Sequence, residues 1–171
     1  MRPDWTLGPN PPLHTLATKI IGWEPVYLEN RVNGSRVLFT DRPEEYITQT
    51  AQKIYHDLAR YHGMAQKWMR RQFEDAVGKR QYLPLLLPGL WELFSAMKCR
   101  ERPDSRNDGV TGYVNPKYIE HIKPRRDKTA DIILKGDSKM HVFMSCSLVQ
   151  ERIRESRRFQ DLYAFRHGCS D

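Results

Sequence analysis

The sequence predicts an α+β fold, in which an N-terminal β-hairpin and a long helix pack with a β-rich C-terminal lobe that ends in a helix. Three observations support this prediction. Two short apolar runs flank Asn33-Gly34, a pair that suits a tight hairpin turn. Apolar residues then recur at helical spacing from Ile47 to Tyr61. Short β-type runs follow from Thr111, before a helical pattern that begins after Ser147.

The length of 171 residues allows one domain or two small lobes that share a core. We divide the chain into an extended arm at 1–13, a hairpin and helical region at 14–80, and a β-rich lobe with a C-terminal helix at 81–171. Four prolines lie in the arm, and this composition disfavours regular structure.

The first half is expected to fold around one helix. Its start is predicted at Asp41 to Glu45, because aspartate caps helices and Pro43 suits a first turn. The helix is expected to bend near Gly63 and to end at Gly78. Its buried face is predicted to carry apolar residues at steps of four and three, namely Ile47, Ala51, Ile54, Leu58 and Tyr61.

The second half is expected to be mainly β-structure. The proline-flanked apolar segment 82–94 predicts a short buried strand followed by a turn, and 98–108 predicts a solvated basic loop. Ser147 and Gln150 form a capping box for the last helix, expected over 148–159, and Tyr163 and Phe165 are expected to pack back onto the body. Three more strands are predicted at 111–115, 132–135 and 140–144.

The charge favours a polyanionic partner. The chain has a formal net charge of +7, and residues 98–171 hold sixteen Lys and Arg against eleven Asp and Glu. Residues 1–97 hold twelve against ten, so the surplus lies mainly in the second half. Basic side chains that neutralise phosphates release condensed counterions and gain affinity from that release.

Several classes of protein are disfavoured by missing patterns. No apolar run reaches the roughly 18 to 20 residues of a membrane helix, and the N-terminus lacks the pattern of a secretory signal. The three cysteines have no CxxC spacing. We therefore expect a cytoplasmic protein with no membrane association and three free thiols.

Catalytic and metal-binding motifs are also missing. The sequence contains no GxxxxGK[ST], GxGxxG, HExxH or GxSxG pattern. His56 and His62 fall about 600° apart on a helix at roughly 100° per residue, so they do not share one face. The expectation is a protein that is not an enzyme and has no cofactor and no metal.

Residues 112–122, 130–136 and 140–147 resemble two related families of DNA-binding proteins. The segment Gly112-Tyr113-Val114-Asn115 to Ile122, followed by a hairpin and a serine before the last helix, is similar to the LytTR DNA-binding domain. The same order, together with the upstream segments 43–54 and 82–95, resembles the competence transcription factor family, ComK. That resemblance implies an oligomeric activator that binds promoter DNA and turns on DNA-uptake genes.

The candidate DNA-binding residues lie in two loops, one turn and one helix. Asn115 is interpreted either as a base contact or as a turn former, with the turn favoured because Asn-Pro suits it. The helix arginines are interpreted either as phosphate contacts or as a solubilising face. The full set comprises Arg100, Arg102, Arg106, Asn115, Lys117, Lys123, Arg125, Arg126, Lys128, Arg152, Arg154, Arg157 and Arg158.

The leading hypothesis is a transcription regulator that binds double-stranded DNA, acting as a homo-oligomer. The alternative is a protein-interaction module, such as a phage-encoded inhibitor that uses its basic loops against a nucleic-acid enzyme. The first predicts salt-dependent binding to duplex DNA, and the second predicts a protein partner and little duplex binding.

Overall fold

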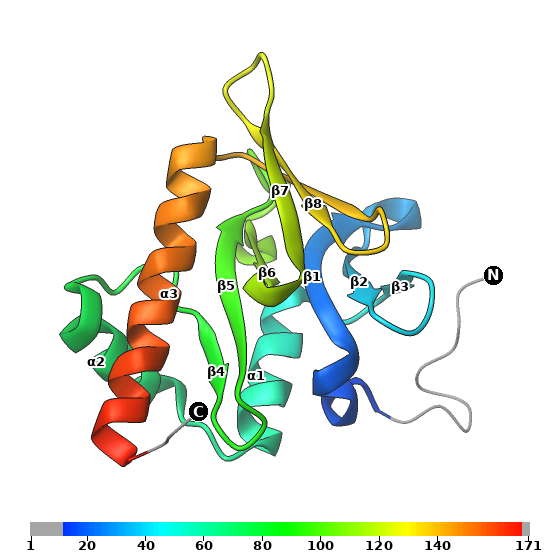
Figure 1. The fold of residues 1–171 in the computed structure, drawn as a ribbon. Helices are drawn as coiled ribbons and strands as arrows, with labels where there is room; N and C mark the ends of the chain where they lie inside the picture. Colours follow the sequence, from blue (N-terminus) through cyan, green and yellow to red (C-terminus); the bar gives the residue numbers. More distant parts are fainter. Residues whose placement is uncertain (1–11, 169–171) are drawn as a thin grey trace.

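The computed structural model describes residues 12–168 and has the mixed α+β fold that the sequence predicts (Figure 1). Six strands form one antiparallel sheet in the order β3-β2-β1-β6-β5-β4, and three form a second sheet in the order β7-β8-β9. The strands are β1 (Ile20–Tyr27), β2 (Asn33–Phe39), β3 (Glu45–Ile47), β4 (Leu85–Leu87), β5 (Glu92–Lys98), β6 (Thr111–Val114), β7 (Ile119–Pro124), β8 (Ala130–Leu134) and β9 (Lys139–Val142). The α-helices are α1 (Ala51–Tyr61), α2 (Gln66–Val77) and α3 (Cys146–His167).

The N-terminal hairpin is present, but its turn is not at Asn33-Gly34. Those two residues lie in β2, paired with Tyr27 and Val26 of β1, and the turn is at residues 28–32. A Cβ on Gly34 would lie 2.4 Å from the carbonyl oxygen of Ile47. Glycine is therefore needed here because β3 approaches closely, and the predicted turn position is wrong.

The predicted helix start at Asp41 is also wrong. Residues Glu45–Ile47 form β3, which pairs with β2, and α1 begins at Ala51. The hydroxyl of Thr50 caps it by accepting a hydrogen bond from the Lys53 amide at 3.1 Å. Ile47 is buried as expected, but it lies in a strand and not in a helix. Pairing with β2 outweighs the local helix signals.

The helical region breaks as the glycines indicate. Gly63, with φ of +73°, follows α1, and α2 starts afresh at Gln66. Gly78 is the left-handed C-cap of α2, which confirms the predicted stop.

The segment 82–94 holds more β-structure than expected. It contributes β4 and the first three residues of β5, which pair with each other across a turn at 88–91. The first six residues of β5 are all buried, so this strand lacks the alternation by which half-buried strands are recognised in sequence.

The C-terminal part departs from expectation at three places. β7 was not predicted, whereas β8 and β9 lie close to the expected ranges. Ser145, not Ser147, caps α3 by accepting from the Leu148 amide at 3.2 Å. α3 continues to His167, so Tyr163 lies on the helix and packs against Trp68, while Phe165 is 86% exposed and does not pack back.

Two apolar clusters lie on the two faces of the six-stranded sheet. Successive residues of β1 alternate between them: Ile20 belongs to the cluster beneath α1 and α2, and Ile21 to the cluster beneath the three-stranded sheet. α3 reaches both clusters, through Phe159 and Val149 respectively. The six-stranded sheet combines strands from the predicted regions 14–80 and 81–171, since β1 pairs with β6.

Two expectations fall partly outside residues 12–168. The predicted arm at 1–13 lies mostly beyond the described residues, although Leu13 is buried and begins a 3-10 helix, Leu13–Lys19. Of the three cysteines, Cys99 and Cys146 have free thiols, and Cys169 lies outside the described residues.

In the described part of the chain, none of the helices combines the length and apolar character needed to cross a membrane.

Candidate nucleic-acid interface

The β7–β8 hairpin projects from the body of the molecule beyond the N-terminal end of α3 (Figure 1). Its tip is a tight turn in which the Lys128 amide donates to the Arg125 carbonyl at 3.1 Å and the Arg125 amide donates to the Thr129 carbonyl at 2.9 Å. Lys128 has φ of +68°. The turn therefore holds four consecutive residues, 125–128, in a defined backbone conformation.

Positive charge is concentrated on this tip. Lys123, Arg125, Arg126 and Lys128 are all exposed, as predicted from the sequence. Arg125 pairs with Asp131 at 3.3 Å. Within residues 12–168 the other three cations form no ion pair, so their charges are available to a partner.

An acidic residue in the same turn has a structural role. The Asp127 carboxylate accepts hydrogen bonds from the Thr129 hydroxyl at 2.5 Å and the Thr129 amide at 3.1 Å. These bonds lower the pKa of Asp127. The Asp127 carboxylate, which lies between two cations in the sequence, therefore stabilises the turn through Thr129.

The base of the hairpin is joined to the neighbouring basic loop. Val142 of β9 pairs with Ala130 at the base of the tip, and the next residue, Phe143, donates its amide to the Lys98 carbonyl at 2.8 Å. Lys98 ends β5, immediately before the loop 99–110. The structure thus places the two basic loops at the same end of the molecule.

Arg100 does not belong to an exposed binding surface. It is 7% exposed, and its guanidinium donates to Asn33 Oδ1 at 2.6 Å and to the carbonyls of Asp108 and Gly109 at 3.3 and 3.2 Å. The prediction that Arg100 lies at the rim of the loop is wrong, because these partners and the ring of Tyr27 enclose it.

Arg102 and Arg106 remain exposed in the same loop. The loop itself is anchored by its acidic residues: Asp104 forms an ion pair with Arg31, and Asp108 accepts a hydrogen bond from the Tyr27 hydroxyl at 2.7 Å. These contacts tie the loop to the end of the β1–β2 hairpin and leave the two arginines without an ion pair among the described residues.

Asn115 has the turn role that the Asn-Pro pair favours. It is 2% exposed, its Oδ1 accepts from the Lys117 amide at 3.1 Å, and its Nδ2 donates to Glu92 Oε2 at 2.5 Å. Lys117 Nζ lies 2.6 Å from Glu92 Oε1. The prediction of Asn115 as a base contact is therefore wrong, and the ammonium of Lys117 is already neutralised by a buried carboxylate.

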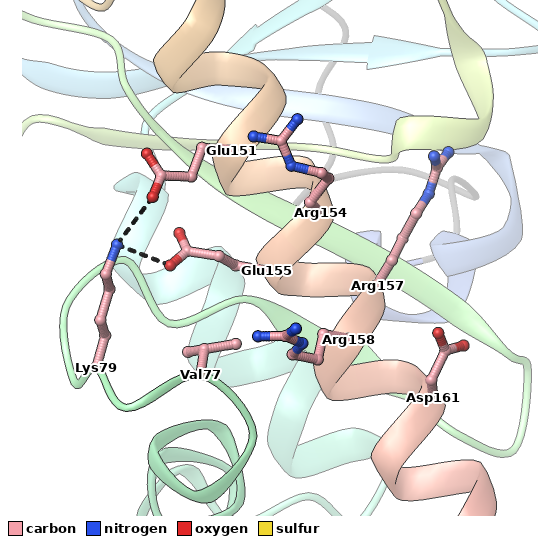
Figure 2. Close-up of a pocket in the computed structure, with 8 residues that line it drawn as sticks. All are labelled: Val77, Lys79, Glu151, Arg154, Glu155, Arg157, Arg158 and Asp161. Atoms are coloured by element: carbon pink, nitrogen blue, oxygen red, sulfur yellow. Dashed lines mark hydrogen bonds and ion pairs between the residues drawn. The ribbon is translucent and has the colours of Figure 1, made fainter.

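Three arginines line one face of α3. Arg154, Arg157 and Arg158 are exposed and form no ion pair within the described part of the chain. They surround a hollow of about 600 Å³ between α3 and the end of α2 (Figure 2). The remaining lining residues are Val77, Lys79, Glu151, Glu155 and Asp161.

Lys79, which sequence analysis missed, changes the charge of this hollow. Its ammonium lies 3.3 Å from Glu151 Oε1 and 2.8 Å from Glu155 Oε2 (Figure 2). The single charge of Lys79 offsets one of these two carboxylates, so the lining holds four cations, Lys79 and the three arginines, against three carboxylates. No local signal could have indicated this, since Lys79 follows α2 and its partners lie on α3.

Arg152 differs from the other helix arginines. Its side chain is 13% exposed, pairs with Glu155 at 2.8 Å and covers the Tyr82 ring with its guanidinium carbon 4.5 Å from the ring centre. Arg152 was among the predicted DNA-binding residues, but α3 packs that face against segment 80–83, so its guanidinium does not belong to an exposed surface.

Residues 12–168 contain no group of three or more His, Cys, Asp or Glu side chains arranged to hold a metal ion.

The comparisons with known proteins add no relative. No family model, no curated protein and no solved structure matches the chain. The resemblance to the LytTR and competence transcription factor families therefore stays a prediction.

Proposed function

We propose that the protein is a DNA-binding transcription regulator whose β7–β8 hairpin enters a groove of duplex DNA. The observation that carries the proposal is the projecting tip, with Lys123, Arg126 and Lys128 exposed and free of ion pairs in the described chain (Figure 1). A two-stranded β-ribbon fits the major groove of B-DNA, and an arginine side chain at its tip is also favoured by the negative potential of a narrow minor groove.

Contacts to the phosphate backbone are assigned to two further groups. The first group is Arg102 and Arg106, which lie in the loop at the same end of the molecule as the tip. The second group is the three exposed arginines of α3, of which the first, Arg154, lies about 12 Å along the helix from Cys146 at about 1.5 Å per residue. Such contacts fix the register of a protein on DNA, whereas base contacts supply sequence preference. The role proposed for the chain is binding, with no catalytic step.

The finer identity of the regulator rests on the resemblance described above. It extends the proposal to an activator of DNA-uptake genes that acts in the cytoplasm as a homo-oligomer. The competing proposal, an inhibitor that binds a nucleic-acid enzyme, uses the same basic loops, and the experiment below separates the two.

The test is fluorescence anisotropy with labelled duplex DNA at about 50 and 200 mM salt. The triple variant Lys123→Gln, Arg126→Gln, Lys128→Gln replaces the three tip cations that form no ion pair in the described chain with an uncharged polar side chain and keeps the Arg125–Asp131 pair. We expect its affinity at 50 mM salt to fall at least tenfold. The slope of log affinity against log salt should become shallower by about 0.9 for each phosphate that the variant no longer neutralises.

A matched control removes three cations elsewhere. Arg60→Gln, Lys67→Gln, Arg71→Gln changes exposed residues of α1 and α2 that make no ion pair in the described structure, and lowers the net charge equally. DNA binding should stay within about twofold of the parent. Equal losses of affinity in both triple variants would show that only net charge matters and would overturn the assignment of DNA binding to the hairpin. If the parent protein does not bind duplex DNA, the proposal that it is a DNA-binding regulator is overturned.

A further inference from the structure

A second hollow lies away from the hairpin tip, between α1, α2, segment 80–83 and β6. Its volume is about 490 Å³, within the range of small-molecule sites in proteins. The lining includes two arginines and three glutamines but no acidic residue. Its residues are Gln52, Tyr55, Gln66, Arg70, Arg80, Gln81, Tyr82, Leu83, Val110, Thr111 and Tyr113.

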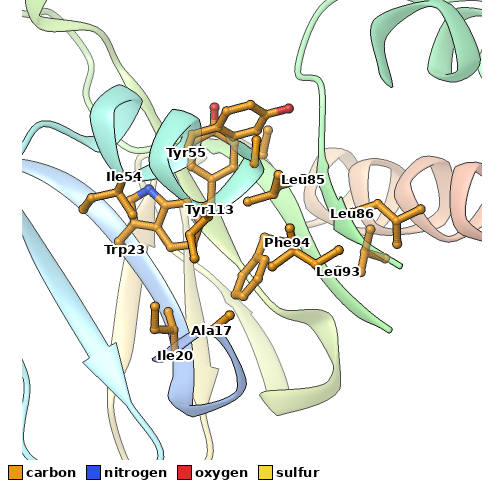
Figure 3. Packing of buried hydrophobic residues seen from close by; sticks show 14 of the residues in the cluster. Ala17, Ile20, Trp23, Ile54, Tyr55, Leu85, Leu86, Leu93, Phe94 and Tyr113 are labelled. Carbon is orange, nitrogen blue, oxygen red and sulfur yellow. The ribbon is translucent and has the colours of Figure 1, made fainter. Parts of the chain in front are cut away.

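Tyr113 places a phenol hydroxyl at the wall of this hollow. Its side chain belongs to the apolar cluster and is 5% exposed, with its ring stacked on Trp23 at a centroid distance of 5.0 Å. The hydroxyls of Tyr55 and Tyr113 point out of this cluster at the same edge (Figure 3). The Tyr55 hydroxyl donates to the Pro84 carbonyl at 3.1 Å, whereas within residues 12–168 the Tyr113 hydroxyl makes no hydrogen bond.

Positive charge lies beside these hydroxyls. Arg70 extends from α2, is exposed and forms no ion pair in the described structure. Arg70 lines the same hollow as Tyr55. Burial raises the pKa of the Tyr55 hydroxyl, Tyr113 raises it further, and the charge of Arg70 opposes the shift. Arg80 also lines the hollow, and its guanidinium pairs with Glu74 at 2.8 Å.

We propose that this hollow binds a small organic anion bearing a carboxylate or a phosphate. Arg70 pairs with the oxyanion, and the Tyr113 hydroxyl donates a hydrogen bond to the ligand at the inner wall. The glutamine amides offer both donors and acceptors to its uncharged part. An anion meets no carboxylate among the lining residues, and the Tyr113 hydroxyl, which lines the hollow, can exchange water for a hydrogen bond to the ligand.

This inference is independent of the proposed DNA binding. Arg70 and Tyr113 belong to neither the hairpin tip nor the α3 arginines, and binding is measured without DNA. Isothermal titration calorimetry with citrate, ribose 5-phosphate and inorganic phosphate, beside uncharged ribose, distinguishes a carboxylate ligand from a phosphate ligand. We expect at least one organic anion to bind with sub-millimolar affinity, more tightly than inorganic phosphate, and ribose not to bind.

Two variants and one control locate the binding. Arg70→Gln should weaken it at least tenfold and Tyr113→Phe about threefold to tenfold, because the first removes a charge-assisted hydrogen bond and the second a neutral one. Arg71→Gln, next to Arg70 but outside the lining, should bind like the parent. Circular dichroism checks that each variant is folded.

Fluorescence gives a second measurement. Because Trp23 stacks on Tyr113, anion binding in the parent should change the tryptophan emission, and the change should be absent from Arg70→Gln. The proposal is overturned if neither organic anion binds the parent, or if Arg70→Gln and Arg71→Gln bind equally.

Discussion

The guanidinium carbon of Arg100 lies 4.0 Å from the centre of the Tyr27 ring, which it covers. Three hydrogen bonds from the same guanidinium to uncharged oxygens complete its surroundings. The residue therefore joins β1 and β2 to the loop 99–110.

Replacement of Arg100 is predicted to affect stability. Arg100→Met should lower the free energy of unfolding by about 2 to 3 kcal/mol, because Asn33 and two carbonyls lose a charged donor and Tyr27 loses its stacked cation. Urea denaturation measures this change. Arg102→Met, at an exposed position two residues away, should change the free energy by less than about 0.5 kcal/mol; equal effects would contradict the structural role.

The α3 arginines are predicted to act on DNA affinity and not on sequence preference. Replacing Arg154, Arg157 and Arg158 together with glutamine should weaken binding to promoter and random duplexes by the same factor, since phosphate contacts read no bases. Anisotropy titrations on both duplexes measure this. An unchanged affinity would leave the three arginines with only a solubilising role, the alternative interpretation of this helix face.

The start of α3 offers a test of capping. Ser145→Ala is expected to destabilise the protein by about 1 kcal/mol, because its hydroxyl accepts from the Leu148 amide. Ser147→Ala removes the serine that the sequence pattern favoured and should cost less than about 0.3 kcal/mol, since alanine suits a first helical turn. Thermal unfolding of the two variants decides between the two caps.

The ion pairs of Lys79 predict a pH dependence of stability. Burial tends to raise the pKa of Glu155, but Lys79 and Arg152 outweigh it and leave the pKa below its ordinary value. A carboxylate with a lowered pKa stabilises the fold above its unfolded-state pKa, near 4.5, and this contribution disappears as the pH falls through the lower folded-state value.

Lys79→Met should therefore lower the urea midpoint of unfolding at pH 7, by a small amount because exposed ion pairs contribute little. The difference from the parent should shrink below about pH 4, where the carboxylates become protonated. Urea unfolding at pH 7 and pH 3.5 measures both differences, and a difference that is the same at both would rule out the ion pairs as its cause.

Sequence reasoning was most successful where the signal is local. The tip cations from Lys123 to Lys128 are neighbours in the chain, so their shared position follows from the turn that carries them. Gly78 ended its helix as predicted for the same reason. Arg100 and Arg152 were misplaced, since their partners Asn33 and Tyr82 lie far away in sequence and composition does not indicate them.

The sequence by itself determined the α+β class, the positions of β8 and β9, the stop of α2 and the exposed basic turn, because each depends on propensities and charges within a few residues. Tertiary structure alone decided that residues 45–47 form a strand, that Gly34 lies inside β2, and that Arg70 and Tyr113 meet at one hollow. Those outcomes depend on strand pairing and close packing between distant segments, whose free energies exceed the local preferences of the residues involved.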